Sequence, residues 1–162
     1  MTSKLEKELY RAAVLTFEEM GFMLPSDEVD ARQQAAKAEA TVTVPFDGPF
    51  SGRLTVTVCG GILGDLAANM LGEDAEVAQE HLDDALGEIG NVICGNILPR
   101  IAGTAGVFDL KPPYVLQHAG PEALSQADTP AATAHVGLDS GRADLALFVT
   151  NAAMIQAGEP AH

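Results

Sequence analysis

Residues 83–101 read DDALGEIGNVICGNILPRI, and this stretch carries the most informative pattern of the 162-residue sequence. Each residue of a helix turns by about 100°, so positions three, four and seven apart share a face. Asp84, Glu88 and Asn91 then fall within an arc of roughly 60°. Four large apolar residues fall on the opposite side of that helix: Leu86, Ile89, Ile93 and Ile97. The segment therefore predicts an amphipathic helix with one core-facing band and one polar stripe.

Three glycines, Gly87, Gly90 and Gly95, lie in the same predicted helix. Each costs about 1 kcal/mol relative to alanine, and no folding gain is evident from the sequence. Gly87 and Gly95 lie on or beside the polar stripe, where a missing side chain lets another backbone approach closely. Asn91 also needs a reason, because asparagine favours caps and turns over helix interiors. We interpret the stripe as a docking surface, and a polar face that is merely solvated is the simpler alternative.

Hydrophobic periodicity outside this helix predicts a strand-rich chain with two hairpins. Leu54, Val56 and Val58 alternate with polar residues, as a half-buried strand requires. Turn-forming residues at 47–49 and 139–141 separate the strands of each hairpin. The expected helices cover residues 3–22, 62–71 and 76–101, and the expected strands cover 41–44, 52–59, 114–117, 132–136 and 143–149.

This order is not the strict alternation of strand and helix that builds a doubly wound sheet. We expect a two-layer α+β fold, with a mixed, largely antiparallel sheet and helices on one face. Residues 1–162 are expected to form a single domain, in which 25–40 is a polar loop with room for one helical turn and 157–162 is a frayed tail.

Composition excludes several classes of function. The net charge is −14, from 23 acidic and 9 basic residues, and Lys and Arg are scattered singly along the sequence. Nucleic-acid binding and anionic membrane surfaces both require concentrated positive charge, so neither partner is expected. No apolar run reaches the ~18 residues that span a bilayer, and residues 1–14 lack the apolar core of a secretory signal. A cytoplasmic location is the simplest assignment.

Metal and nucleotide sites are not predicted. Cys59 and Cys94 form no CxxC pair or Cys/His cluster, and both are expected to be small buried side chains. The histidines at 81, 118, 135 and 162 have no ligand spacing and are expected at the surface or at caps. The glycines at 60, 61 and 64 lack the Lys-Ser/Thr of a phosphate-binding loop, so a turn is expected there.

The stretch D84-A-L-G-E88-I-G-N91 resembles the active helix of the CheC and CheX family of chemotaxis phosphatases. That helix carries Asp or Ser, then Glu after three residues, then Asn after two more. The order of elements is also similar to CheX, including PFSGRLTV at 49–56 and ANMLG at 68–72. CheC has two such motifs and CheX has one, so this chain is similar to CheX. A proline that follows the motif in CheC is loosely matched by Pro113.

The resemblance implies that the substrate is the phospho-aspartate of a CheY-like response regulator. It implies that Asn91 positions the attacking water and that Glu88 pairs with a lysine of the regulator. Asp84, Gly87 and Gly95 would contact the partner around them. The regulator would supply Mg²⁺, and this chain would hold no metal or other cofactor of its own. CheX-like proteins are dimers, and the apolar strand at 145–149 in the final hairpin weakly supports a homodimer here.

Two other functions remain open at this point. A non-catalytic module of the same fold would bind a regulator or another signalling protein without hydrolysis, and would tolerate loss of the Asn91 carboxamide. A structural dimerisation domain would bury the polar stripe between two subunits.

Overall fold

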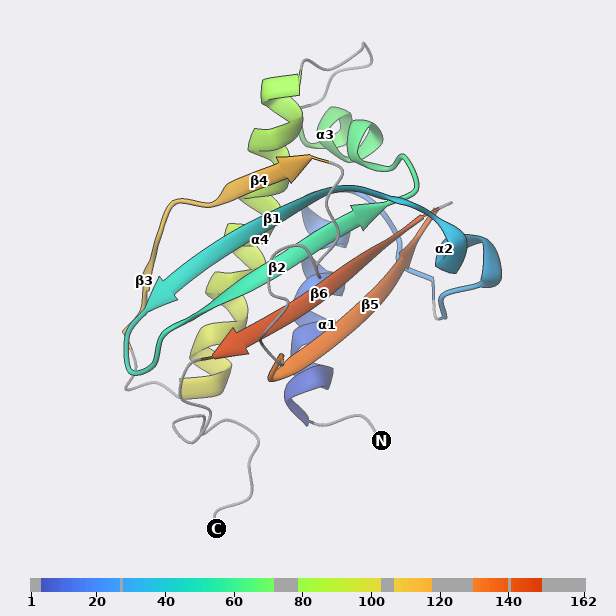
Figure 1. The fold of residues 1–162 in the computed structure, drawn as a ribbon. Helices are drawn as coiled ribbons and strands as arrows, with labels where there is room; N and C mark the ends of the chain where they lie inside the picture. The colour runs from blue at the N-terminus through green and yellow to red at the C-terminus, as the bar shows by residue number, and fades with distance from the viewer. Residues whose placement is uncertain are drawn as a thin grey trace.

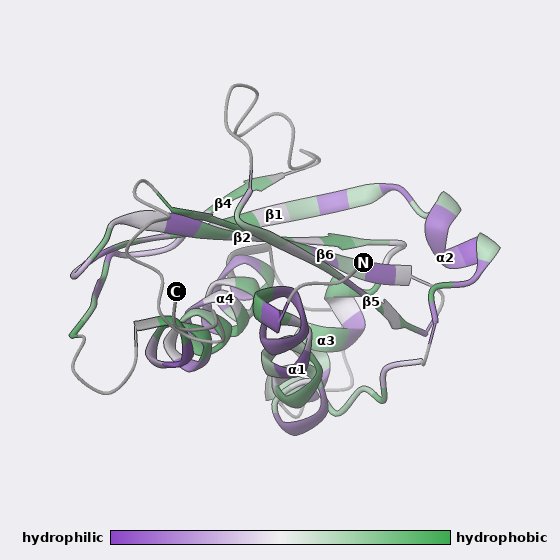
Figure 2. Ribbon diagram, turned by 90° about the horizontal axis from the view of Figure 1, so that it is seen from below, coloured by the Kyte–Doolittle hydropathy of each residue, from purple (hydrophilic) through white to green (hydrophobic). Residues whose placement is uncertain are grey.

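In the described part of the chain, an antiparallel sheet forms one layer and three helices form the other (Figures 1 and 2). The computed structural model describes residues 4–26, 28–71, 79–102, 107–117, 130–139 and 141–149. The strands are β1 (Ala38–Asp47), β2 (Gly52–Cys59), β3 (Asp109–Leu110), β4 (Tyr114–Gln117), β5 (Ala132–Leu138) and β6 (Gly141–Val149). The helices are α1 (Lys4–Glu19), α2 (Ala31–Ala35), α3 (Leu63–Leu71) and α4 (Gln79–Ala102).

The order of the strands is β3-β1-β2-β6-β5, and β4 also pairs with β1. Every described pair of strands is antiparallel. Figure 2 shows α1, α3 and α4 together on one face of the sheet. The expected two-layer α+β fold is therefore confirmed.

Several element boundaries differ from the sequence expectation. β2 and β4 have the expected bounds, whereas β1 continues three residues past Val44 and starts three residues before residue 41. The strand runs through Pro45, which has no N–H group to donate. Its carbonyl accepts a hydrogen bond from Lys111 N at 2.8 Å, so no donor is required at this position. α1 ends at Glu19 because the N–H groups of Gly21 and Met23 both turn back to the Phe17 carbonyl. The two-residue β3 was not predicted. The expectations for residues 76–78, 140 and 157–162 lie outside the described residues.

Helix α4 is the main support of the sheet. Its apolar band packs against the strands as expected, and Leu86, Ile89, Ile93 and Ile97 have no exposed surface. Full burial of each such side chain contributes about 1.5–3 kcal/mol relative to exposure. The opposite face of the same helix is thereby turned outward.

Gly90 belongs to this packed side and not to a docking surface. A Cβ atom at Gly90 would lie 3.0 Å from the methyl groups of both Val42 and Val44 on β1. The helix therefore crosses β1 too closely for any side chain at this position. The sequence alone shows no folding gain for this glycine, and the close approach of α4 to β1 supplies one.

The short helix α2 sits at one end of the sheet, away from the other helices (Figure 2). Asp30 begins it with a capping box that Gln33 completes. Arg142 of β6 holds its other end, donating from Nη1 to the carbonyls of Gln33, Gln34 and Ala36 at 2.7–3.0 Å. A long-range side chain thus fixes the helical turn for which the expected polar loop at 25–40 left room.

The Arg142 guanidinium is itself held by Asp144, which accepts from Arg142 Nε at 3.0 Å and pairs with His135 Nδ1 at 2.7 Å. The hydrogen bond to Asp144 raises the pKa of His135, against the opposing effect of partial burial. Burial acts to raise the pKa of Asp144, but the hydrogen bonds from His135 and Arg142 outweigh it, and the pKa lies below its ordinary value. His135 is exposed, as expected, but it is also part of this network.

We expect Gly90→Val to lower the free energy of unfolding by about 2 kcal/mol, because the new methyl groups overpack the contact with β1. The matched control is Gly95→Val in the same helix, where a Cβ atom would meet nothing within 4 Å. Gly95→Val should change the free energy of unfolding by no more than about 0.5 kcal/mol. Urea unfolding of both variants measures the difference, and equal losses would contradict the close crossing of α4 and β1.

The network around Asp144 predicts pH-dependent stability. A raised pKa of His135 in the folded state contributes stability that is full below about pH 6.5 and is lost as pH rises through the folded value. The lowered pKa of Asp144 contributes stability that is full above about pH 4 and is lost as the pH falls through the folded value. His135→Gln should therefore cost up to ~1 kcal/mol at about pH 5.5, and less at about pH 9.

Urea unfolding at the two pH values tests this expectation. His81→Gln is the control, because His81 is an exposed histidine on α4. A loss for His135→Gln that is equal at both pH values would show that the charge of the imidazole does not contribute.

Candidate functional site

The polar stripe of α4 borders a surface hollow of about 360 Å³. Asp84 and Glu88 are exposed, and Asn91 is half-buried on the same side of the helix. The hollow is lined by Asp83, Asp84, Gly87, Glu88, Asn91, Pro113 and Val115. The structure therefore brings together four of the five residues singled out from the sequence.

The second wall of the hollow comes from the segment that enters β4. Val115 pairs with Val42 of β1, so its position is fixed by the sheet. Pro113 lies over Gly87, where a Cβ atom would be 3.4 Å from the Pro113 Cγ. Asn91 thus lies in a cleft between a helix and a sheet edge, with an apolar side opposite the carboxylates. The sequence analysis missed Val115, because this wall depends on pairing between β1 and β4. It also missed Asp83, which lies on α4 beside Asp84.

Gly95 is not part of the hollow. It is exposed, and a Cβ atom built on it would meet nothing within 4 Å. Pro99 has no N–H to donate to the Gly95 carbonyl four residues earlier, and its ring crowds that carbonyl. The crowding acts on the carbonyl and not on a side chain at 95, so Pro99 does not explain why this residue is a glycine.

Negative charge dominates the hollow. Asp83, Asp84 and Glu88 line it, and no Lys or Arg is among its lining residues. The site therefore suits a cationic group of a partner beside a carboxamide that can both donate and accept hydrogen bonds. In the described part of the chain, no three His, Cys, Asp or Glu side chains are placed to hold a metal ion.

The remaining candidates have structural roles. Cys94 is buried behind the stripe, and burial raises the pKa of its thiol to about 12, so it is no nucleophile at neutral pH. Cys59 is also a free, buried thiol. Gly60 and Gly61 have φ values of +93° and +76°, as the expected turn between β2 and α3 requires. His81 is exposed, and the histidines at 118 and 162 lie outside the described residues.

No helix among the described residues has the length and apolar character needed to cross a membrane. Comparison with curated protein sequences gives no match. A family model described as "Chemotaxis phosphatase CheX" matches residues 40–136, a range that includes Asp84, Glu88, Asn91 and Pro113.

Solved structures with the same fold come from several bacteria. Chemotaxis protein CheX from Vibrio vulnificus is 18% identical with a TM-score of 0.66, over 91% of this chain and 97% of that one. A putative chemotaxis protein from Desulfovibrio vulgaris Hildenborough is 16% identical with a TM-score of 0.66, over 92% and 99%. The CheX–CheY–BeF3–Mg²⁺ complex from Borrelia burgdorferi matches at 16% identity and a TM-score of 0.64, over 90% and 97%. At these identities the likeness establishes the fold.

Proposed function

Because the chain belongs to the CheX family of chemotaxis phosphatases, we propose that it hydrolyses the phospho-aspartate of a CheY-like response regulator. The observation that carries the proposal is the placement of Glu88 and Asn91 on one outward side of a continuous helix, at the rim of a hollow. The Borrelia burgdorferi relative has been crystallised with CheY, BeF3 and Mg²⁺. We accordingly propose that the regulator brings Mg²⁺ and that this chain contributes no cofactor.

Asn91 is the residue assigned to the chemistry. Hydrolysis of an acyl phosphate requires a water placed in line with the scissile bond and stabilisation of the charge on the phosphoryl oxygens. A carboxamide can orient that water by accepting one of its hydrogens and does not act as a base. Asn91 is half-buried and lines the hollow together with Gly87 and Pro113.

Glu88 is the residue assigned to docking. It is exposed beside Asp84, at the acidic mouth of the hollow. A carboxylate there pairs with a lysine of the regulator and sets the register in which the phosphoryl group meets Asn91. Asp84 lies one turn earlier and adds a contact at the rim. Gly87 is buried beneath Pro113, so it would meet the partner only within the hollow. Gly95 would be a contact only if the partner extends beyond the hollow.

We further propose that the protein is cytoplasmic, where response regulators act, and that it is a homodimer. The segment 145–149 offers no free edge, because it lies in β6 between β2 and β5. Among the described strands, β4 pairs only with β1, and its Tyr114 and Leu116 are 49% and 39% exposed. The edge of β4 is therefore the better two-fold contact.

Asn91→Ala should leave binding of the phosphorylated regulator nearly unchanged and remove most of the acceleration. Loss of one preorganised transition-state contact costs about 10²- to 10³-fold. The measurement is single-turnover loss of acyl phosphate, with regulator and Mg²⁺ present, titrated over this protein. Equal rates for Asn91→Ala and the wild type would exclude the water-positioning role. Failure of both to exceed spontaneous hydrolysis with any regulator tried would favour the non-catalytic binding module.

Glu88→Gln should weaken binding of the phosphorylated regulator as well as turnover, because it removes the charge and keeps the shape. The loss should shrink at high salt, since salt already screens an exposed ion pair. Asp84→Ala, on the same face, should be the mildest of the three variants. A binding loss for Glu88→Gln that does not depend on salt would contradict the charge-pairing role.

The homodimer predicts a light-scattering mass of about twice the 16.8 kDa of one chain at micromolar concentration. Leu116→Lys should shift the mass toward one chain, because an inserted lysine blocks pairing at a sheet edge. A wild-type mass equal to one chain would contradict the dimer, and an unchanged dimer in Leu116→Lys would exclude β4 as its contact.

A further inference from the structure

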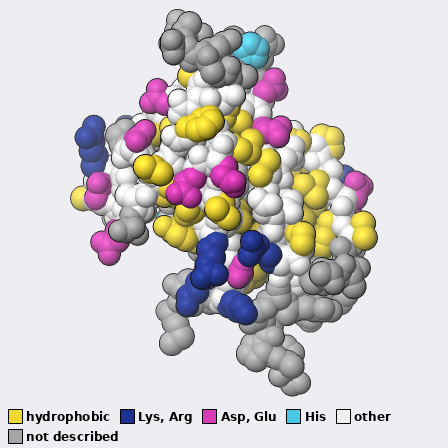
Figure 3. All heavy atoms as spheres, turned by 180° about the vertical axis from the view of Figure 1, so that it is seen from behind, with side chains coloured by type: hydrophobic (Ala, Val, Ile, Leu, Met, Phe, Trp, Pro, Cys, Tyr) yellow, Lys and Arg dark blue, Asp and Glu magenta, His cyan; other side chains and the backbone are white. Residues whose placement is uncertain are grey.

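Positive charge gathers at one end of this acidic protein, where α1 begins and α4 ends. Lys4, Lys7 and Arg11 are exposed along one side of α1, within an arc of about 60°. Arg100 of α4 joins them by donating to Glu8 at 2.7 Å, and Arg11 lies 3.9 Å from the same carboxylate. Figure 3 shows this gathering on the helical face, with dark blue side chains around a magenta one. Four of the nine Lys and Arg residues thus share one surface, which corrects the view that they are scattered singly.

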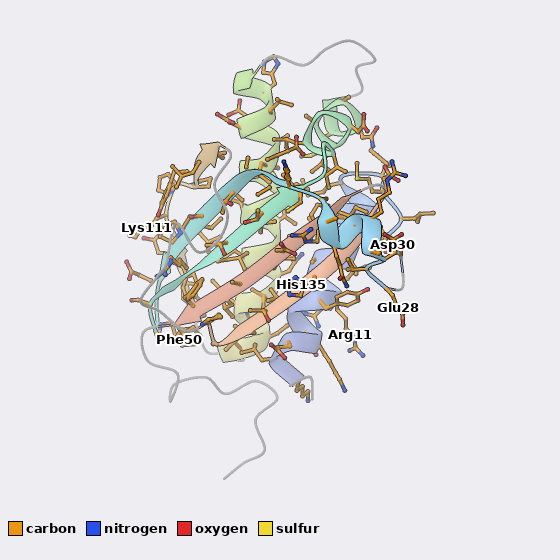
Figure 4. All side chains as sticks on the ribbon, turned by 45° about the vertical axis from the view of Figure 1, so that its right-hand side comes forward. Arg11, Glu28, Asp30, Phe50, Lys111 and His135 are labelled. Atoms are coloured by element: carbon orange, nitrogen blue, oxygen red, sulfur yellow. The ribbon has the colours of Figure 1, made fainter. Side chains whose placement is uncertain are left out.

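Beside this basic end lies a groove of about 510 Å³ between α1 and the edge strand β5. Four residues line it from α1, namely Glu6, Lys7, Tyr10 and Arg11, and residues 133–135 line it from β5. Figure 4 shows Arg11 and His135 projecting on the same flank of the molecule from these two elements. Within the described part of the chain, Lys7 has no ion-pair partner and Arg11 has only the 3.9 Å contact. Both cations are therefore available to a ligand in the groove.

The edge of β5 is occupied at both ends and open between them. Thr133 N donates to Glu6 at 3.2 Å, and Ser26 N donates to the Gly137 carbonyl at 3.0 Å. Alternate residues of an antiparallel strand present their backbone groups to the same side, so the N–H and C=O of His135 also point away from β6. No hydrogen bond from a described residue reaches them on that side. The groove thus contains a short stretch of pairable backbone beside two cations, and its one carboxylate, Glu6, accepts hydrogen bonds from Thr133.

We propose that this groove binds a short, extended, acidic segment of a partner protein. The backbone of the segment pairs with His135, in the manner of strand addition, and its carboxylates meet Lys7 and Arg11. Glu6 and Glu8 interrupt the basic surface, so a peptide with a few spaced carboxylates fits it better than a continuous phosphate backbone. The length of α4 between Glu88 and Arg100 is about 18 Å, so the basic end is separate from the hollow at Asn91. The inference does not depend on the proposed phosphatase activity.

The test uses a fluorescein-labelled peptide of alternating aspartate and valine, with an asparagine–valine peptide as its neutral counterpart, followed by fluorescence anisotropy. The acidic peptide should bind the full chain in a salt-dependent manner, and the neutral peptide should bind about tenfold more weakly. The double variant Lys7→Gln with Arg11→Gln should bind the acidic peptide about tenfold more weakly than the wild type does. The matched control is Arg32→Gln with Lys37→Gln, which removes the same charge from exposed residues outside the groove. Asn91→Ala should bind the peptide as the wild type does.

Strand addition is tested separately at residue 135. His135→Pro removes the outward N–H and should weaken binding of the acidic peptide about tenfold. His135→Ala keeps the N–H, so its dissociation constant should stay within about threefold of the wild-type value. Failure of the wild type to bind the acidic peptide below about 1 mM would overturn the proposal. Equal losses of peptide binding in the two double variants would also overturn the proposal, because the attraction would then come from the overall charge of the protein and not from the groove. Tighter binding of a poly-dT oligonucleotide, lost on changing Lys7 and Arg11, would reassign the surface to nucleic acid.

Discussion

The crossing of α4 over β1 at Gly90 is the contact on which the candidate site depends. Two valines of β1 would lie 3.0 Å from a Cβ atom at this position, so the helix lies against the sheet with no side chain between them. This contact and the buried isoleucines on either side of it fix the rotation of the helix about its own axis. Glu88 and Asn91 then face outward because every alternative rotation would bury a carboxylate or expose the apolar band. The orientation of the polar stripe is a consequence of core packing.

The two ends of α4 also differ in charge, which organises the surface beyond one site. Asp83, Asp84 and Glu88 make its first half acidic, while Arg100 in its last turn joins the basic residues of α1. A single long helix therefore presents opposite charges to solvent at separate places. On a protein with net charge −14, the acidic half resembles the surroundings and the basic end stands apart from them.

Local sequence patterns were sufficient to predict which face of each main helix is buried and where most strands lie. Period-two alternation located β2, and helical phase identified both the buried and the polar sides of α4. The same phase also places Gly90 beside Ile93 on the core side, so its packing role could have been inferred from the sequence. The spacing of Lys4, Lys7 and Arg11 likewise predicts one side of a helix. The wall at Pro113 and Val115, the two-residue β3 and the anchoring of α2 by Arg142 depend on contacts between distant parts of the chain, for which no local pattern exists.

The contact between Gly87 and Pro113 ties two positions of the sequence together. A methyl group at 87 would touch the proline ring at 3.4 Å, which is an ordinary distance, but a larger side chain would have to displace the ring. Displacing the ring would move the strand that follows it, and this strand is in register with β1. Substitutions at 87 and 113 therefore combine non-additively, and a bulky residue at one becomes acceptable only with a smaller one at the other. Related sequences should vary at these two positions as a pair, even where their motif residues are identical.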